Sequence, residues 1–410
     1  VAPPTPVVRT ARNAVFTAFG INGAAFAAFA SRVPDIKHEL GLTAGELGLT
    51  LFSLSVGAVI GLPLSGWFVH RFGAARTTLG AAVVQGLGLV LVGLGVTTLT
   101  SRGIAMAGLV LVGMGSGVFD VAMNLEGASV ERLLRRSIMP HFHAAFSGGT
   151  VVSALVGAGL SYLHVPVLAH LAGTAALLLA ITPWFLRAFL PRAAEDDPHG
   201  DGPHGDEPQA GRGKAGIAAA WREPRTLLIG VVVCAAAFTE GTANDWIGVA
   251  LSDGYDLPRW AGVLGFAVFL TAMTTGRILG TRLLDRRGRV PVLRVLLVAA
   301  VVGSVLVVFG GPVLAFIGAA VWGLGASLGF PVGMSAAADE PRRAPARMSV
   351  VSTIGYTAFL GGPPLLGFLG DHVGVLRSLL VVGAMAAVAL AVLPAVREPT
   401  PSDPAPDPAA

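Results

Sequence analysis

The chain has 410 residues, of which 53% are hydrophobic and 13% are charged. A soluble domain carries about 25% charged residues, so this composition excludes an ordinary soluble protein and indicates a chain that crosses a membrane many times. The formal net charge of +4 would suit a nucleic-acid-binding protein. The arginines are distributed as membrane topology requires, which explains this charge, so we expect no nucleic-acid partner. Cys234 is the single cysteine, which excludes a disulfide within the chain.

Apolar segments separated by Gly, Pro and charged residues predict the secondary structure. Each segment is long enough to cross the ~30 Å hydrocarbon core as a helix that rises ~1.5 Å per residue. The predicted spans cover residues 12–33, 46–69, 77–97, 103–124, 141–162, 166–189, 226–250, 260–283, 291–310, 312–336, 346–369 and 374–396. We therefore predict an all-α membrane protein with twelve transmembrane helices.

The composition changes abruptly between the sixth and seventh predicted spans. Residues 191–222 are rich in Pro, His, Gly, Asp and Glu, so we predict a disordered cytoplasmic linker. Its histidines and carboxylates would also suit a metal site, but a solvated linker is the favoured interpretation, and we predict no metal or cofactor. The other predicted units are an N-terminal six-helix bundle over 1–190, a C-terminal six-helix bundle over 223–398 and a disordered tail over 399–410.

The lysines and arginines predict the orientation of the chain. With the N-terminus inside the cell, 22 of the 28 Lys and Arg residues fall in cytoplasmic segments. Because positive residues concentrate in cytoplasmic loops, we predict that both termini and the linker are cytoplasmic. Arg277 is the one cation that lies well within a predicted span.

The two predicted bundles contain a weak internal repeat. Asn22-Gly23 in the first span matches Glu240-Gly241 in the seventh, and Gly113-Met-Gly115 in the fourth matches Gly323-Leu-Gly325 in the tenth. Repeats with equal numbers of spans, joined by a cytoplasmic linker, are typical of transporters whose two bundles rock about a central site.

The connections after the second and eighth spans carry a recognisable motif. Gly66-Trp-Phe-Val-His-Arg-Phe-Gly73, ending at Arg76, resembles the G-x-L-x-D-R-x-G-R signature of the major facilitator superfamily, and Leu283-Leu-Asp-Arg-Arg-Gly-Arg289 resembles its second copy. His70 stands where the family usually has Asp, and Thr281 stands where the second copy would have Gly. The resemblance implies a cytoplasmic gating motif formed by Gly66, His70, Arg71, Gly73, Arg76, Glu126, Asp285, Arg286, Gly288 and Arg289.

Three further segments resemble a bacterial branch near the fucose-permease-type sugar transporters. They are Asp120-Val-Ala-Met-Asn-Leu-Glu126, Met139-Pro-His-Phe-His143 and Glu240 to Trp246. The resemblance implies a monomeric, multi-pass transporter in a bacterial cytoplasmic membrane. It also implies that the first and fourth helices of each half line a central cavity.

Polar residues in the seventh span are the main candidates for a site. A charge at such depth costs at least ~2.5 kcal/mol, so its default interpretation is functional. Glu240 is the first candidate for a proton carrier or substrate ligand, with a structural hydrogen bond as the alternative. Asn244 shares the face of Glu240, whereas Asp245 points elsewhere in a regular helix. Asn22, the repeat equivalent of Glu240, is a candidate substrate ligand facing it, with an interhelical bond as the alternative.

Asp120 and Asn124 share one face of the fourth span. Asp120 is a candidate second protonation site. The slightly favoured alternative pairs Asp120 or Glu126 with Arg71 or Arg76 in a cytoplasmic latch that holds the outward-facing state.

Two cations and one tryptophan complete the candidates. Arg277 requires a carboxylate or carbonyl partner that the sequence does not identify. Arg32, at the outer end of the first span, is a candidate substrate contact, with extension of its side chain to the interface as the favoured alternative. Trp246 is a candidate for sugar stacking, with an interfacial aromatic belt as the ordinary interpretation.

These residues favour a proton-coupled secondary transporter whose partners are the lipid bilayer, protons and a small polar solute such as a sugar or metabolite. A multidrug or metabolite efflux proton antiporter is the alternative, and a non-transporting membrane sensor is an alternative from another class. Drug antiporters of the superfamily that the chain resembles usually carry an Arg in the fourth span. No Arg follows Arg102 there in this sequence, so the resemblance favours a polar solute over drugs. An enzyme is not expected, because Gly325-Ala-Ser-Leu-Gly329 matches G-x-S-x-G only within a span, where small residues serve packing.

Overall fold

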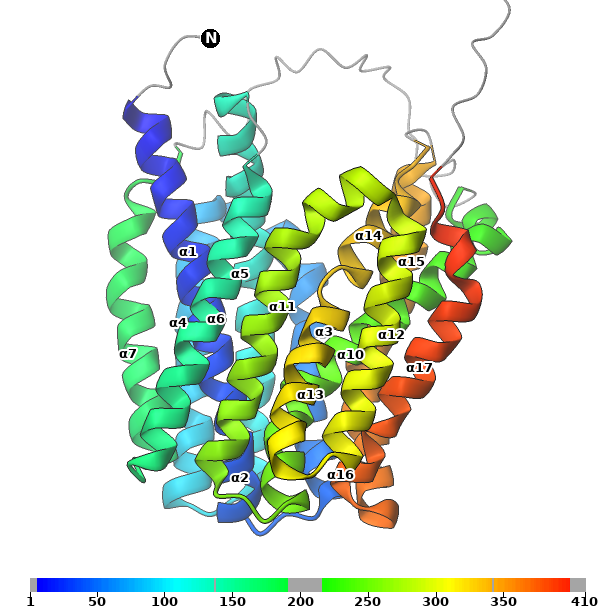
Figure 1. Cartoon of the computed structure of the whole chain (residues 1–410). Helices are drawn as coiled ribbons and strands as arrows, with labels where there is room; N and C mark the ends of the chain where they lie inside the picture. Colours follow the sequence, from blue (N-terminus) through cyan, green and yellow to red (C-terminus); the bar gives the residue numbers. More distant parts are fainter. Residues whose placement is uncertain (1–5, 136–137, 191–215, 341–342, 399–410) are drawn as a thin grey trace, which may run out of the picture.

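The computed structural model describes residues 6–135, 138–190, 216–340 and 343–398 (Figure 1). Helices account for the secondary structure throughout these ranges, which confirms the all-α prediction. The helices form two bundles that lie side by side, one from the first half of the chain and one from the second (Figure 1).

The first bundle contains the first six predicted spans. Its elements are α1 (Pro6–Ala30), α2 (Val33–Glu39), α3 (Ala44–Phe72), α4 (Ala74–Gly93), a π-helical turn (Leu94–Thr98), α5 (Arg102–Leu134), α6 (Met139–Tyr162) and α7 (Val167–Leu186). The short helix α2 follows the first span and was not predicted as a separate element.

The second bundle contains the remaining six spans. Its elements are α10 (Pro224–Gly254), α11 (Arg259–Arg287), α12 (Arg289–Phe309), α13 (Gly311–Ala326), α14 (Gly329–Ala337), α15 (Ala344–Val373), α16 (Val375–Ser378), α17 (Leu380–Val392) and a 3-10 turn (Leu393–Val396). The predicted tenth span is therefore two helices, with a break between Ala326 and Gly329.

Eleven helical segments in the described part of the chain are long and apolar enough to cross a membrane. The predicted span that is absent from these eleven is the eleventh, over 346–369, which corresponds to α15, a helix of 30 residues. Pro363 and Pro364 inside α15, together with its glycines, lower its mean hydropathy without ending the helix. Residues 216–220 are helical, so the predicted disordered linker is wrong at its C-terminal end. Residues 191–215 and 399–410 lie outside the described ranges.

The pair of bundles has two ends, the linker end and the α2 end. At the linker end, α1 begins at Pro6, α7 ends at Leu186 and α10 begins at Pro224. The α2 end is the opposite one, where α2 lies (Figure 1). The orientation predicted from the arginines makes the linker end the cytoplasmic one.

The internal repeat has a structural basis in helix packing. A Cβ added to Gly115 on α5 would lie 2.5 Å from the backbone nitrogen of Gln85 on α4, and one added to Gly325 on α13 would lie 2.5 Å from that of Ala300 on α12. The fourth span of each half therefore packs against the third of that half through an equivalent glycine. Small residues allow this approach in lipid.

The gating motif also contains a pair of equivalent turns. Gly73 joins α3 to α4 with φ of 81°, and Gly288 joins α11 to α12 with φ of 75°. L-amino acids with a side chain rarely adopt this region, so glycine is needed at both one-residue connections. The backbone conformation of the two turns therefore explains Gly73 and Gly288.

The two halves meet through α3 against α15 and through α6 against α11. Near the α2 end the contact is backbone to backbone: a Cβ added to Gly367 on α15 would lie 2.7 Å from the carbonyl oxygen of Ala44 and 3.1 Å from the Cα of Gly48 on α3. No larger residue fits while the halves are closed here.

Gly367→Val is therefore expected to push α3 and α15 apart at the α2 end. Thr43 and Asp371, whose side-chain oxygens are 3.4 Å apart, provide the readout as a pair of introduced cysteines in a Cys234→Ala background. We expect Gly367→Val to reduce cross-linking of this pair several-fold. Gly361→Val on the same helix is the control, because no atom outside the helix lies within 4 Å of its added Cβ. Equal cross-linking in both variants would contradict the expectation.

A cluster of ion pairs ties the C-terminal bundle together at the linker end. Asp339 accepts from Arg225 and from Arg289, each at 2.8 Å. Glu223, directly before α10, accepts from Arg347 Nε at 2.8 Å. The hydrogen bonds from Arg347 hold the pKa of the Glu223 carboxyl below its ordinary value of 4.5.

The lowered pKa of Glu223 makes the stability of this cluster depend on pH. The ionised Glu223 carboxylate contributes its full stabilisation of the folded state above pH 4.5. This stabilisation is lost as the pH falls through the lower pKa of the folded state. Glu223→Gln is therefore expected to lower the apparent Tm at neutral pH, and the difference from the parent protein should shrink below about pH 4. Thermal unfolding of both proteins across pH measures this, with Asp285→Asn, an exposed carboxylate at the same end, as the control. A difference that stays constant down to pH 3 would refute it.

Candidate functional site

An ion pair joins α10 and α11 near the middle of the C-terminal bundle. Arg277 Nη2 donates to Glu240 Oε2 at 2.7 Å. The Arg277 side chain is 31% exposed and that of Glu240 19% exposed, so the pair lines accessible space and is not sealed in the helix core. Glu240 lies ~24 Å along α10 from Pro224, about halfway through the helix. The structure thus supplies the partner of Arg277 that the sequence could not identify.

The same arginine also binds the break in the tenth span. Arg277 Nε donates to the carbonyl oxygen of Ser327 at 3.1 Å. Ser327 and Leu328 separate α13 from α14, so backbone carbonyls there are released from the helical hydrogen-bond pattern. Irregular backbone at membrane depth is tolerated where protein or a water-filled space surrounds it. Glu240, Arg277 and the helix break therefore form one connected unit, which we call the central pair site.

Asn22 does not face this site. It is 1% exposed, and its Oδ1 accepts from Gln85 Nε2 on α4 at 3.4 Å. The structure thus favours the alternative interpretation, an interhelical bond within the N-terminal bundle. The repeat places Asn22 and Glu240 at equivalent positions, but the shorter side chain of Asn22 binds Gln85 inside its own bundle.

The other polar residues of the seventh span point in different directions. Asn244 is partly exposed, and its Oδ1 atom is buried without a hydrogen bond among the described residues. Asp245 is also partly exposed. Trp246 is 0% exposed, so no face of its ring is free for stacking in this conformation. Its position in the bundle core also excludes the interfacial-belt interpretation.

The N-terminal half contributes Asp120 and Asn124 on α5. Asn124 Nδ2 donates to Asp120 Oδ1 at 3.2 Å and to the Asp120 carbonyl oxygen at 2.8 Å. Both residues are partly exposed. Asp120 lies within electrostatic range of the Tyr356 hydroxyl on α15, so it faces the other half of the molecule. The interpretation of Asp120 as a second protonation site stays a prediction.

The rest of the gating motif lies at the linker end. Glu126 is 1% exposed, and its Oε1 accepts from the backbone nitrogen of Leu190 at 2.7 Å. Arg71 and Arg76 are exposed, and the Arg71 guanidinium lies 5.7 Å from the centroid of the Phe72 ring. Gly66, Asp285 and Arg286 are exposed, whereas Arg289 joins the Asp339 cluster within the C-terminal half. The predicted latch between Arg71 or Arg76 and an acid of α5 stays a prediction.

A buried network surrounds Arg32 at the α2 end. Arg32 is 1% exposed; its Nη1 donates to Asp35 Oδ2 and its Nε to His170 Nδ1, each at 2.9 Å. The interpretation that Arg32 extends to the membrane interface is therefore wrong, because its guanidinium is held inside by two partners. Ser161 Oγ also donates to Asp35, at 3.3 Å.

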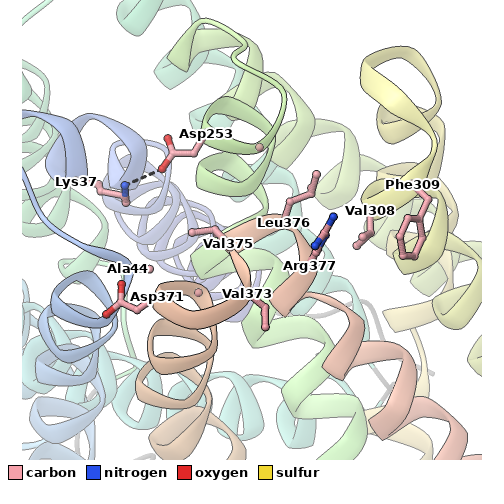
Figure 2. Close-up of a pocket in the computed structure, with 13 residues that line it drawn as sticks. Lys37, Ala44, Asp253, Val308, Phe309, Asp371, Val373, Val375, Leu376 and Arg377 are labelled. Carbon is pink, nitrogen blue, oxygen red and sulfur yellow. Dashed lines mark ion pairs between the residues drawn. The ribbon is translucent and has the colours of Figure 1, made fainter.

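This network continues into the C-terminal half. Arg259, at the start of α11, binds the second carboxylate oxygen of Asp35 at 3.0 Å. Lys37 on α2 binds Asp253 at the end of α10 at 2.7 Å, beside a cavity of about 650 Å³ that Asp371 and Arg377 also line (Figure 2). Helix α2 therefore fastens the two halves together at this end. We call these two ion pairs the α2-end clasp.

Sequence reasoning missed the clasp residues Asp35, Lys37, Asp253 and Arg259. They lie in short connections, where charged residues are ordinary, so no periodicity marks them. The signal that could have found them is the proline-initiated segment Pro34-Asp35 followed by Lys37 between two spans.

The comparisons with known proteins agree with this architecture. The Major Facilitator Superfamily model matches residues 15–316 and 266–410. An MFS-type transporter of Yersinia pestis, itself uncharacterised, is 33% identical over 358 residues, which cover 86% of this chain and 87% of that protein.

Solved structures resemble the chain in fold. A mutant of the nucleoside transporter NupG gives a TM-score of 0.75 at 14% identity and covers 95% of this chain and 99% of that one. A variant of the E. coli fucose:proton symporter FucP gives 0.62 at 14% identity, covering 95% and 98%. The family match extends over nearly the whole length, and the two helical bundles of the described residues agree with it. The chain therefore belongs to the major facilitator superfamily of multi-pass membrane transporters.

Proposed function

We propose that this protein is a proton-coupled secondary transporter that moves a small polar solute by alternating access. It acts as a monomer in a bacterial cytoplasmic membrane, with both termini on the cytoplasmic side. The observation that carries the proposal is the Glu240–Arg277 pair, a partly exposed ion pair halfway through the bundle and joined to a helix break. The relationship to transporters and the distribution of positive residues support it.

The pair couples a proton to the protein's conformation as follows. When Glu240 is ionised, it neutralises Arg277, which in turn holds the Ser327 carbonyl at the end of α13. Protonation of Glu240 removes the opposite charge, and Arg277 must then find another partner or move toward water. Because Arg277 touches the break between α13 and α14, this change reaches a second lining helix. A solute that binds only one of the two arrangements is thereby linked to the proton.

Alternating access also needs a closure at each end. The α2-end clasp supports a state that is closed at the α2 end, which would be the inward-facing state. Additional contacts across the halves lie on the same side, including the bond from Ser55 Oγ on α3 to the Phe359 carbonyl oxygen on α15 at 2.8 Å. Opening this end would break the two ion pairs and separate Gly48 from Gly367.

Purified protein in liposomes tests the proposal. Liposomes with an internal pH dye and an imposed proton gradient report proton movement when a candidate solute is added. Solutes are first selected by their stabilisation of the purified protein against heat. We expect the selected solute to move protons in the parent protein and not in Glu240→Gln. Solute movement that is unchanged by the proton gradient would reject proton coupling, and the direction of movement distinguishes uptake from efflux.

A further inference from the structure

Asp245 is a carboxylate at membrane depth that the proton-coupling scheme does not use. It lies ~32 Å along α10 from Pro224, one turn before Gly248 on the same helix face. A Cβ added to Gly248 would lie 3.2 Å from Pro34 Cγ of α2. A Cβ added to Gly241, one turn before Asp245 on the same face, would lie 3.1 Å from the Phe359 ring of α15. The face of α10 that carries Asp245 therefore extends from α15 to α2, just inside the end that the clasp closes.

The Asp245 carboxylate has no neutralising partner among the described residues. No hydrogen bond or ion pair to its side chain occurs there, although the side chain is only partly exposed. An ionised carboxylate at this depth is costly unless a proton, a cation or water compensates it.

The cations in this region are already engaged with other carboxylates. Arg277 binds Glu240, Arg259 binds Asp35 and Lys37 binds Asp253. In the N-terminal half, Asp120 is bound by the neutral amide of Asn124. None of these cations is left to neutralise Asp245. An anion would be repelled by Asp245, and a neutral polyol could donate hydrogen bonds to it but brings no positive charge.

We propose that the transported solute carries a cationic amine and that Asp245 binds it. An ammonium group has three N–H donors and one positive charge, which match a carboxylate without a cation of its own. This inference rests on the proposed function, because it names the substrate class of that transporter. Glu240 remains the proton-coupling residue, and Asp245 selects the solute.

Matched ligands that differ only in charge test the inference. Glucosamine, glucose and glucuronate form one trio, and ethanolamine, ethylene glycol and glycolate form a second. Thermal stabilisation of the full-length protein in lipid nanodiscs is measured for each ligand. We expect stabilisation by an amine and not by its neutral or anionic counterpart. The same amine should bind Asp245→Asn about 30-fold more weakly or worse.

Two variants separate loss of the site from loss of the fold. Asp256→Asn removes an exposed carboxylate that follows the same helix and lies outside the clasp, and it is expected to retain amine binding. Asp245→Glu keeps the charge and is expected to retain part of it. Stabilisation by the neutral or anionic members, stabilisation by none, or full amine binding by Asp245→Asn would each overturn the inference. Proton-coupled movement of a neutral solute would reject the amine inference and keep the proposed function. Amine binding without proton movement would reject proton coupling and keep Asp245 as an amine site.

Discussion

Glu240→Gln is expected to abolish proton-driven solute accumulation while the protein still folds. Glutamine keeps the size and one acceptor of Glu240 but cannot exchange a proton or neutralise Arg277, to which Glu240 is bound at 2.7 Å. Solute-driven proton movement in liposomes should fall by about 100-fold or more, in line with loss of a proton-transfer group. Solute counterflow, which requires no net proton transfer, should be retained to a much larger extent.

Arg277→Gln extends this expectation, because it leaves Glu240 without its cation. We expect Arg277→Gln to have a lower apparent Tm than Glu240→Gln. The double variant Glu240→Gln/Arg277→Gln should recover part of this loss, because two neutral amides replace an uncompensated charge. Glu46→Gln is the matched control. Glu46 also binds an arginine, Arg102, but at 3.4 Å with both side chains 30% or more exposed, so its removal should change little. A Glu240→Gln protein with full proton-coupled transport would remove this residue from the mechanism.

Arg259→Ala is expected to open the α2 end. Asp35 is 5% exposed and keeps Arg32 within its own half, so the substitution removes the contact across the halves and leaves the carboxylate compensated. A charge-assisted hydrogen bond is worth about 2 kcal/mol, so the equilibrium should shift about 30-fold away from the closed clasp.

Spin labels measure both ends of the molecule at once. Leu99 and Val313, exposed residues of opposite halves at the α2 end, should move apart in Arg259→Ala. Leu133 and Leu283, exposed near the linker end, should approach each other. Arg102→Ala is the control, because Arg102 lies at the α2 end but binds Glu46 within its own half. Distance distributions that stay the same at both ends would show that the clasp does not hold this state.

Substitutions in the Glu240–Arg277 pair and in the clasp are expected to have different effects, because the two sets of charges join different parts of the molecule. The central pair joins two helices of one half, so its state alters the shape of that half and its lining. The clasp joins the two halves, so it alters their relative position. In the proposed mechanism, coupling requires both the pair and the clasp. A proton at Glu240 can favour one state only if the states differ in how they hold Arg277.

The sequence by itself determined the apolar spans and the two related halves, and it indicated Glu240 and Arg277 as candidates for a site. In lipid each helix must satisfy its own backbone hydrogen bonds, so the length of an apolar segment predicts a helix whatever its neighbours are. A charge in such a segment is costly wherever it points, so the sequence also identifies functional candidates.

The tertiary structure alone decided which of those groups meet. Glu240 binds Arg277 and Asn22 binds Gln85, although the repeat makes Asn22 and Glu240 equivalent. Asp35 and Arg259 are 224 positions apart in the sequence and meet across the halves, and Trp246 faces the core of its bundle. These contacts depend on the rotation and tilt of each helix against its neighbours, which helix packing sets and hydropathy does not encode.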